Sequence, residues 1–315
     1  MIEKIENIKK EIAKVVVGQE KMIDGLLIGL LCDGHVLIEG IPGLAKTTTV
    51  KALSEALGLG FKRIQFTPDL LPSDILGAQI YDPKNNEFKI KHGPIFTNLL
   101  LADEINRAPA KVQSALLEVM QEKQVTIGED SFKLEPPFFV MATQNPVEQE
   151  GVYQLPEAQL DRFMLKLVVG YNTKDEELEI AKRISNKTNE VIEPILTHDD
   201  LIELKNIIQN IHVDEEVQKY IIELVSATRN PRDYGLDDVA SWLAFGASPR
   251  VSIDMFKAIK AQAFIRGKDF VSPVDIAYIV KEVMRHRIIL SYEAEADGIT
   301  TDMIIEKILE AVLVP

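Results

Sequence analysis

The chain has 315 residues, of which 46% are hydrophobic, and its 35 Lys and Arg residues stand against 49 Asp and Glu residues, for a net charge of −14. This length and composition predict a globular protein of one or two domains. The acidic balance argues against a broad nucleic-acid-binding surface, which needs clustered cations. Cys32 is the only cysteine, so an intramolecular disulfide and a thiolate metal cluster are both excluded.

Helical spacing of apolar residues opens the chain, with isoleucines at positions 2, 5, 8 and 12. Residues 20–31 predict a second helix, and residues 36–38 predict a buried strand. The amino terminus lacks the apolar segment of a signal peptide, and no apolar run approaches transmembrane length. We therefore expect a soluble cytoplasmic protein with no segment inserted in a membrane.

The segment from Gly40 to Thr47 reads Gly-Ile-Pro-Gly-Leu-Ala-Lys-Thr and precedes a predicted helix over residues 48–57. A strand, a Gly-rich turn and a helix form the context of a phosphate-binding loop, where backbone N–H groups surround a phosphate. Lys46 supplies a charge for the β- and γ-phosphates, and the Thr47 hydroxyl can ligate Mg²⁺. The usual Gly before the Lys is replaced by Ala45, which fits only with helical dihedrals. An ordinary strand–turn–helix connection is the alternative.

Residues 97–104 read as a buried strand that ends in two carboxylates, Asp103 and Glu104. In NTPases an Asp at such a strand end holds Mg²⁺, usually through water, because hard cations take oxygen ligands. The adjacent Glu104 can orient or deprotonate the attacking water. A solvated helix start is the alternative, since acids are favoured at helix N-termini. The phosphate-loop pattern upstream makes this alternative the weaker one.

Three further polar positions follow in order. Asn145 comes after a predicted strand over residues 138–143 and can hydrogen-bond the attacking water or the γ-phosphate. Arg162 lies in Leu-Asp-Arg-Phe, and Arg250 lies in Ser-Pro-Arg. Ser248 is expected to be an N-cap, which places Arg250 in a first helical turn, where a cation is unfavourable unless an anion is near. A surface position or a salt bridge is the alternative for either arginine.

Two segments predict hairpins, residues 81–94 around Pro-Lys-Asn-Asn and residues 125–134 around a Gly-containing turn. A helix over residues 110–121 lies between them. The second hairpin is as consistent with a plain surface hairpin as with a functional one. Gln65, on a short predicted strand over residues 63–66, is expected to be an ordinary strand-surface residue. A contact between Gln65 and the catalytic Glu is the less favoured alternative.

Strands alternate with helices in the first part of the chain, which predicts an α/β fold with a doubly wound parallel sheet. After Thr197 nearly every segment is helical. We expect residues 1–194 to form the core with an N-terminal helix and a linker, and residues 195–315 to form a helical lid. The nucleotide is expected in a cleft between the two parts, touched by Arg250 from the lid. The basic run over residues 285–287 is expected to be a solvated helix end.

This ordered set of motifs resembles an AAA+ ATPase, a P-loop NTPase with an α/β core and an all-α lid. The sequences GIPGLAKT, LADEINRAPAKVQSALLEVMQE, ATQNPVEQEG, LPEAQLDRF and ASPR are similar to the MoxR branch in particular, where Ala before the Lys is normal. The resemblance covers nearly the whole chain and is most specific in the first 170 residues.

The resemblance implies a role for each motif. It implies a Walker A loop, a Walker B pair, a sensor 1, an arginine finger, a sensor 2 and an adenine-side segment. The residues implied to bind ATP or ADP are Val17, Gly18, Gln19, Gly40, Pro42, Gly43, Leu44, Ala45, Lys46, Thr47, Thr48 and Asp103. The implied catalytic residues are Glu104, Asn145, Arg162 and Arg250, and the implied Mg²⁺ ligands are Thr47 and Asp103.

The resemblance also implies an assembly and a task. In the family geometry Arg162 lies away from its own phosphate loop and reaches a neighbouring subunit, so we expect a ring, most simply a homo-hexamer. In the helix-2-insert branch the first hairpin faces the central pore. Family members commonly work with a protein carrying a von Willebrand A-type domain and act on a protein client, with metal-cofactor insertion or complex assembly as the outcome.

Two other functions stay open at this point. A nucleic-acid motor or loader shares the helix-2 insert, but the acidic charge and the lack of a recognisable DNA-binding module favour a protein client without nucleic acid. Stimulation of ATPase activity by nucleic acid would discriminate the two. A nucleotide-gated scaffold without turnover is the third function, and Glu104 and Asn145 argue against it because binding alone needs neither.

Overall fold

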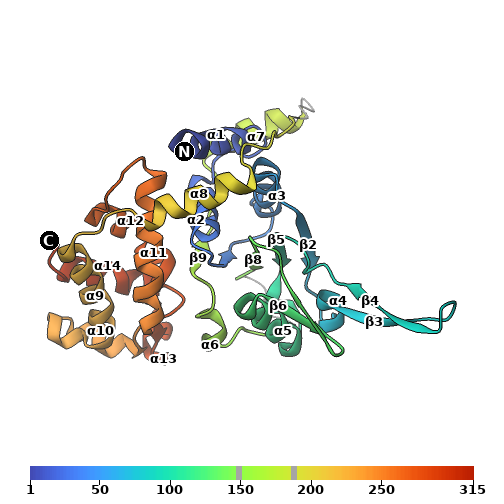
Figure 1. The fold of residues 1–315 in the computed structure, drawn as a ribbon. Coiled ribbons are helices and arrows are strands. Elements are labelled where there is room, and N and C mark those ends of the chain that lie inside the picture. Colours follow the sequence, from blue (N-terminus) through green and yellow to red (C-terminus); the bar gives the residue numbers. More distant parts are fainter. Residues whose placement is uncertain (147–150, 186–189) are drawn as a thin grey trace.

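A five-stranded parallel sheet in the order β2-β5-β8-β1-β9 forms the centre of the computed structural model, which describes residues 1–146, 151–185 and 190–315 (Figure 1). Its strands are β1 (Val36–Glu39), β2 (Phe61–Gln65), β5 (Leu99–Asp103), β8 (Phe139–Gln144) and β9 (Leu165–Val168). All four pairings are parallel, so the carboxyl ends of the strands meet at one edge of the sheet.

Helices cover both faces of this sheet. Its strands are mostly apolar, and successive side chains point to opposite faces, so both faces are buried. Val36 and Ile38 of β1 belong to one apolar cluster with helices α1, α2 and α3, whereas Leu37 belongs to a second cluster with α5. This arrangement confirms the predicted doubly wound α/β fold. The helices of this part are α1 (Ile2–Ala13), α2 (Glu20–Leu31), α3 (Lys46–Leu57), α4 (Pro72–Leu76), the 3₁₀ turn η1 (Ile105–Arg107), α5 (Ala110–Glu122), α6 (Glu157–Leu160) and α7 (Lys174–Ser185).

Both predicted hairpins are present. Antiparallel strands β3 (Gly77–Asp82) and β4 (Glu87–His92) form a long arm that projects from the body of the molecule in Figure 1. Strands β6 (Gln124–Ile127) and β7 (Asp130–Lys133) form the shorter hairpin after α5. The turn between β3 and β4 contains the Pro-Lys-Asn-Asn sequence, which favours tight turns.

The remainder of the chain is mostly helical, as expected. Its elements are α8 (His198–Gln209), α9 (Glu215–Arg229), the 3₁₀ turn η2 (Pro231–Tyr234), α10 (Asp237–Trp242), β10 (Leu243–Phe245), α11 (Pro249–Ile265), α12 (Pro273–Met284), β11 (Ile289–Leu290), α13 (Tyr292–Ala296) and α14 (Thr301–Ala311). A short antiparallel pair, β10 with β11, is an addition to the expected all-α lid.

The lid shares its hydrophobic core with the sheet. Helix α11 packs on α2 and helix α12 packs on β9, and their buried residues join the same apolar cluster as Val36. The lid begins with a capping box, in which the Thr197 hydroxyl accepts the N–H of Asp200 and the Asp200 carboxylate accepts the N–H of Thr197. The division between residues 194 and 195 stays a prediction. Within the described part of the chain, no helix is long and apolar enough to cross a membrane.

Candidate functional site

The predicted phosphate loop lies at the carboxyl edge of the sheet, between β1 and α3. The N–H of Gly40 donates to the carbonyl oxygen of Gln144 on β8 at 3.3 Å, and α3 begins at Lys46. A Cβ atom at Gly40 would lie 2.9 Å from the carbonyl oxygen of Val169, so only glycine fits where the turn passes the end of β9. The loop therefore leads directly into the N-terminus of a 12-residue helix, which is a favourable place for a phosphate.

Lys46 closes this loop. Its ammonium group donates a hydrogen bond to the carbonyl oxygen of Gly40. The side chain is half-buried, and this desolvation lowers the pKa of Lys46, while the carboxylates of Asp103, Glu104 and Glu39 act in the opposite direction. The positive charge of Lys46 is thus surrounded by the loop on one side and by carboxylates at strand ends on the other.

Ala45 departs from the expectation of right-handed helical dihedrals. Its φ of 54° and ψ of 17° lie in the left-handed region, because residue 45 turns the chain into α3. An L-residue with a Cβ pays roughly 1 kcal/mol for this conformation. The other predicted loop residues differ in exposure: Leu44 is buried in the core, Thr47 is half-buried on α3, and Pro42, Gly43 and Thr48 are exposed.

Asp103, at the end of β5, is buried and has a partner on each neighbouring strand. The Thr143 hydroxyl of β8 donates to Asp103 Oδ1 at 2.6 Å and accepts the N–H of Glu104 at 2.9 Å. On the other side, the Nε–H group of Arg63 on β2 donates to Asp103 Oδ2 at 3.0 Å. Sequence reasoning missed Arg63 and Thr143. The signal that could have found them is their position near the carboxyl ends of the two strands beside β5.

Glu104 has a left-handed backbone, with φ of 55°, and its carboxylate accepts a hydrogen bond from Gln65 Nε2 at 2.7 Å. The expectation that Gln65 is an ordinary surface residue is wrong, because the β2–β5 register places Gln65 directly beside Asp103. Gln65 in turn accepts a hydrogen bond from Arg63 at 2.9 Å. Arg107 lies 3.2 Å from Glu104 of its own chain. The carboxylates of Asp103 and Glu104 are therefore held by side chains from β2, β8 and η1.

Asn145 follows β8, the strand that lies between β1 and β5. The register pairs Glu39, just before the phosphate loop, with Gln144, just before Asn145. Asn145 is buried, with 6% of its surface exposed. Asn145 therefore follows the strand that lies between the strand before the phosphate loop and the strand that ends at Asp103.

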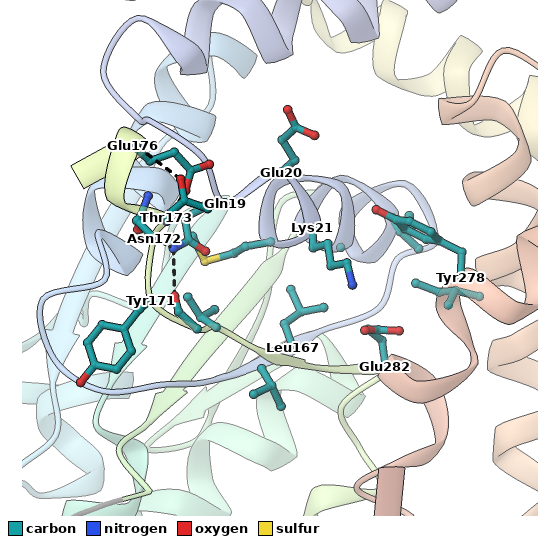
Figure 2. Close-up of a pocket in the computed structure, with 17 residues that line it drawn as sticks. Gln19, Glu20, Lys21, Leu167, Tyr171, Asn172, Thr173, Glu176, Tyr278 and Glu282 are labelled. Carbon is teal, nitrogen blue, oxygen red and sulfur yellow. Dashed lines mark hydrogen bonds between the residues drawn. The ribbon is translucent and has the colours of Figure 1, made fainter. Parts of the chain in front are cut away.

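A cavity of about 460 Å³ extends from the predicted adenine-side segment to the lid (Figure 2). Gln19 lines one end and donates to Asn172 Oδ1 at 3.0 Å and to the carbonyl oxygen of Gly170 at 3.3 Å. The Asn172 amide donates to the carbonyl oxygen of Val17 at 2.9 Å, which ties the segment around Gly18 to the end of β9. Tyr278 and Glu282 of α12 line the other end, as Figure 2 shows.

This cavity lies beside the phosphate loop. Val169 lines it, and the N–H of Val169 donates to the carbonyl oxygen of Glu39, the residue before the loop, at 2.8 Å. Its walls between the two ends are apolar and come from α2 and β9, which suits a flat aromatic ring. One face of the molecule thus combines a phosphate loop, two carboxylates, a polar sensor position and an apolar cavity.

Arg162 and Arg250 lie at the opposite edge of the sheet. Both line a second cavity, of about 340 Å³, together with Asp33, Gly34 and His35, which precede β1. Arg162 itself precedes β9, and the N–H of Met164 bonds to the carbonyl oxygen of His35. Since β1 and β9 are parallel, this is the amino edge, whereas the phosphate loop is at the carboxyl edge.

The expectation that Arg250 touches the nucleotide in a cleft of its own chain is therefore wrong. The lid docks with α11 on α2, and this places the N-terminus of α11 beside the Arg162 segment. Arg250 donates to the carbonyl oxygen of Asp161 at 3.2 Å and lies 3.6 Å from its carboxylate. Ser248 is at the N-cap position, but its hydroxyl contacts the Asp161 carboxylate at 3.2 Å instead of capping the helix.

Comparisons with known proteins agree with this geometry. A family model described as "ATPase family associated with various cellular activities (AAA)" matches residues 35–165, and an AAA lid domain model matches residues 237–308. The chain is 49% identical to Chaperone MoxR1 of Mycobacterium tuberculosis, over 97% of this chain and 81% of that protein. It is 32% identical to Protein MoxR of Paracoccus denitrificans, over 92% and 90%.

A solved structure is also similar. A protein of Cytophaga hutchinsonii, provisionally described as an ATPase, superposes with a TM-score of 0.94 at 52% identity, covering 100% of this chain and 96% of that one. The relatives match across both the sheet and the lid, so the similarity includes both edges described above. We conclude that the chain is a chaperone-like AAA+ ATPase of the MoxR family.

Proposed function

We propose that this ATPase works as a head-to-tail ring in which each active site is built from two subunits. The observation that carries the proposal is the separation of the site residues: Lys46, Glu104 and Asn145 lie at the carboxyl edge of the sheet, and Arg162 and Arg250 lie at the amino edge. One chain therefore cannot bring all five to the same phosphate. A rotation that places the amino edge of one subunit on the carboxyl edge of the next would complete every site.

Within such a site the residues divide the work. Lys46 and the N-terminus of α3 bind the phosphates, and the apolar cavity beside Gln19 takes the adenine base. Glu104 accepts the proton of the attacking water, and Asn145 orients that water. Thr47 and Asp103 fit Mg²⁺ because hydroxyl and carboxylate oxygens are its preferred ligands, and the bound ion would neutralise charge on the phosphates.

The neighbouring subunit would supply the cations. Arg162 of that subunit stabilises the negative charge that develops on the γ-phosphate, and Arg250 adds a second positive charge from the lid. Arg107 is a weaker candidate for this role because it already contacts Glu104 of its own chain. We propose six subunits, the number that the family resemblance implies.

The task of the ring is proposed to be remodelling of a protein client. The β3–β4 arm supports this, since Tyr81 and Phe88 at its outer part are 48% and 68% exposed although both are large and apolar. Solvent-exposed aromatic groups on a projecting arm suit transient contacts with an unfolded segment. A partner with a von Willebrand A-type domain, and maturation of a metal-containing or multi-subunit client, complete the proposal by family resemblance.

Subunit mixing tests the two-subunit site. Lys46→Ala subunits keep an intact finger and Arg162→Ala subunits keep an intact loop, so neither is active alone but their mixture should hydrolyse ATP. Arg232→Ala, which removes an exposed lid arginine outside both cavities, is the matched control and should behave like the parent. An inactive mixture, together with a parental specific activity that does not depend on protein concentration, would show that the site is not shared.

A further inference from the structure

The basic run after α12 is not the solvated helix end that its composition predicts. Arg285, His286 and Arg287 are 9%, 7% and 6% exposed. Buried charged and polar side chains are costly unless they are paired, so the burial of these three residues requires specific partners. Helix α12 packs against the lid helices α11 and α14 and against the edge strand β9, and the run that follows it meets the segment before β9.

Arg285 pairs with the Asp302 carboxylate at 2.9 Å, and all three side chains also bond to backbone carbonyl groups of the segment that carries Arg162. Arg287 donates to the carbonyl oxygens of Asp161 at 3.1 Å and Phe163 at 3.0 Å, the residues on either side of Arg162. His286 Nε2 also donates to Phe163 O, at 2.8 Å, and Arg285 donates to the carbonyl oxygen of Lys166 at 3.1 Å. All three side chains therefore hold one short stretch of main chain.

The Asp161 side chain also holds this stretch against the lid. The Asp161 carboxylate lies 2.9 Å from Arg287 Nε and also contacts Ser248 and Arg250 at the start of α11. Arg287 is held in place by a second carboxylate, that of Asp254. With both neighbours anchored to the lid, Arg162 presents its side chain to the cavity at the amino edge.

The same helix reaches the nucleotide side of the molecule. Tyr278, Ile279 and Glu282 of α12 line the large cavity beside the phosphate loop, as Figure 2 shows for Tyr278 and Glu282. Helix α12 has 12 residues, so it spans about 18 Å at 1.5 Å per residue. A single rigid element thus connects the cavity at one edge of the sheet to the segment that carries Arg162 at the other.

We infer that Arg285, His286 and Arg287 are positioning residues for Arg162, and that α12 is the element by which the nucleotide cavity of one subunit sets the arginine that this subunit presents to the next. The inference rests on the proposed role of Arg162. It goes further by assigning a function to a lid helix that lines the cavity and leads into the buried run over residues 285–287.

Mixed rings can separate positioning from general damage to the fold. A Lys46→Ala subunit can contribute a functional Arg162 to a shared site but no functional phosphate loop. An Arg162→Ala subunit can contribute a functional phosphate loop but no arginine finger. We would therefore place Arg287→Lys in one type of subunit or in the other and measure the ATPase activity of each mixture. Lysine keeps the charge beside Asp161 and Asp254, but it lacks the planar fork that bonds both carbonyl groups.

The expected result is asymmetric. Activity should fall about tenfold or more when the finger-donating subunit carries Arg287→Lys, and should stay within about twofold when the loop-donating subunit carries it, because small displacements of a catalytic group have large costs. Asp161→Asn keeps the size of the side chain, removes its charge and should give the same asymmetry. Arg232→Lys, in an exposed lid arginine that lines neither cavity, is the matched control.

The outcomes distinguish a failure of the shared active site from a failure of the positioning role. If the parental mixture of Lys46→Ala and Arg162→Ala subunits is inactive, the proposed shared site is wrong and the positioning inference falls with it. If that mixture is active but Arg287→Lys and Asp161→Asn reduce activity equally in both arrangements, the residues only stabilise the fold. No loss in either arrangement would also overturn the inference.

Discussion

The two edges of the central sheet are built differently. At the carboxyl edge, the functional groups follow the ends of adjacent strands and bond to one another within the α/β core, as Arg63, Asp103 and Thr143 do. At the amino edge, Arg162 and Arg250 come from different parts of the chain and are held through contacts with the lid. The first edge depends on strand order alone, whereas the second depends on how the lid docks.

This difference has a consequence for function. A nucleotide bound at the carboxyl edge, as proposed, would meet a largely preformed set of groups, since the sheet fixes the loop, the two carboxylates and Asn145. The positions of the arginines at the amino edge depend instead on contacts between the lid and the segment around Arg162. In the proposed ring, changes at the carboxyl edge should therefore affect the chemistry, and changes at the amino edge should affect coupling between subunits.

The largest effect is expected from Glu104→Gln at the carboxyl edge. The change removes the proposed base but keeps a group that can bond Gln65, so the turnover number should fall by about 10²- to 10⁴-fold while nucleotide affinity is retained. Single-turnover hydrolysis and equilibrium binding measure the two quantities separately. Glu118→Gln on the exposed face of α5 is the matched control. Parental hydrolysis by Glu104→Gln would show that the base lies elsewhere.

The second prediction concerns pH and the amino edge. His35 is buried there, where its Nδ1 accepts the N–H of Val140 at 3.1 Å and its Nε2–H donates to the carbonyl oxygen of Met120 at 3.0 Å. Burial lowers the pKa of His35 to about 4, and burial also lowers the pKa of His286 well below its usual value. These two histidines are therefore neutral in the folded protein at neutral pH.

The direction of the effect follows from proton uptake on unfolding. Below the unfolded pKa of about 6.5 the unfolded chain binds a proton that folded His35 does not, so stability is complete above that pH and decreases toward pH 4, by about 3 kcal/mol for His35 alone. Denaturant unfolding between pH 7.5 and 4.5 measures this slope. His35→Gln, whose amide can accept and donate without titrating, should flatten it, and His198→Gln at an exposed position should not. Equal stability of the parent at both pH values would contradict the prediction.

The third prediction is a smaller loss at the carboxyl edge. Asn145→Ala removes a neutral hydrogen-bonding group, so turnover should decrease about tenfold or more while the nucleotide dissociation constant changes little. Steady-state kinetics and nucleotide titration give the two numbers, with Asn210→Ala on the lid surface as a control. A large rise in the dissociation constant with unchanged turnover would instead assign Asn145 to binding.

The contrast between the edges also explains what the sequence could predict. The phosphate loop, Asp103, Glu104 and Asn145 were found because each follows an apolar run that forms a buried strand. Such signals are local, and parallel pairing then brings the strand ends together without further information. The two hairpins were found for the same reason, from alternation around turn residues.

Apart from the backbone of Ala45, the errors involve contacts between distant segments. The role of Gln65 depends on the register of β2 against β5, which a single strand pattern does not contain. The position of Arg250 depends on α11 packing against α2. The run at 285–287 looked solvated because charged residues are usually exposed, but carbonyl groups after α6 accept its hydrogen bonds. Each of these facts arises only when the lid or a neighbouring strand is in place.

The smallest expected effect is at Ala45, a residue of the carboxyl edge whose backbone is left-handed although right-handed helical dihedrals were expected. Its left-handed backbone costs an alanine roughly 1 kcal/mol, and glycine would relieve this cost. Part of the relief is lost because glycine increases the conformational entropy of the unfolded chain. Ala45→Gly should therefore raise the free energy of unfolding by less than about 1 kcal/mol. Lys46 and Gly40 hold the loop in either case, so nucleotide affinity should change little.

A matched substitution makes this small effect interpretable. Ala181→Gly, on the exposed surface within α7, should lower the free energy of unfolding by about 0.5–1 kcal/mol, because glycine is unfavourable inside a helix. The two Ala→Gly changes should thus have opposite signs in the same urea titration. If both lower stability equally, residue 45 is not strained in the folded protein. In that case the alanine would lie in the loop without a backbone cost, and its left-handed conformation would not distinguish this phosphate loop from one that has glycine before the lysine.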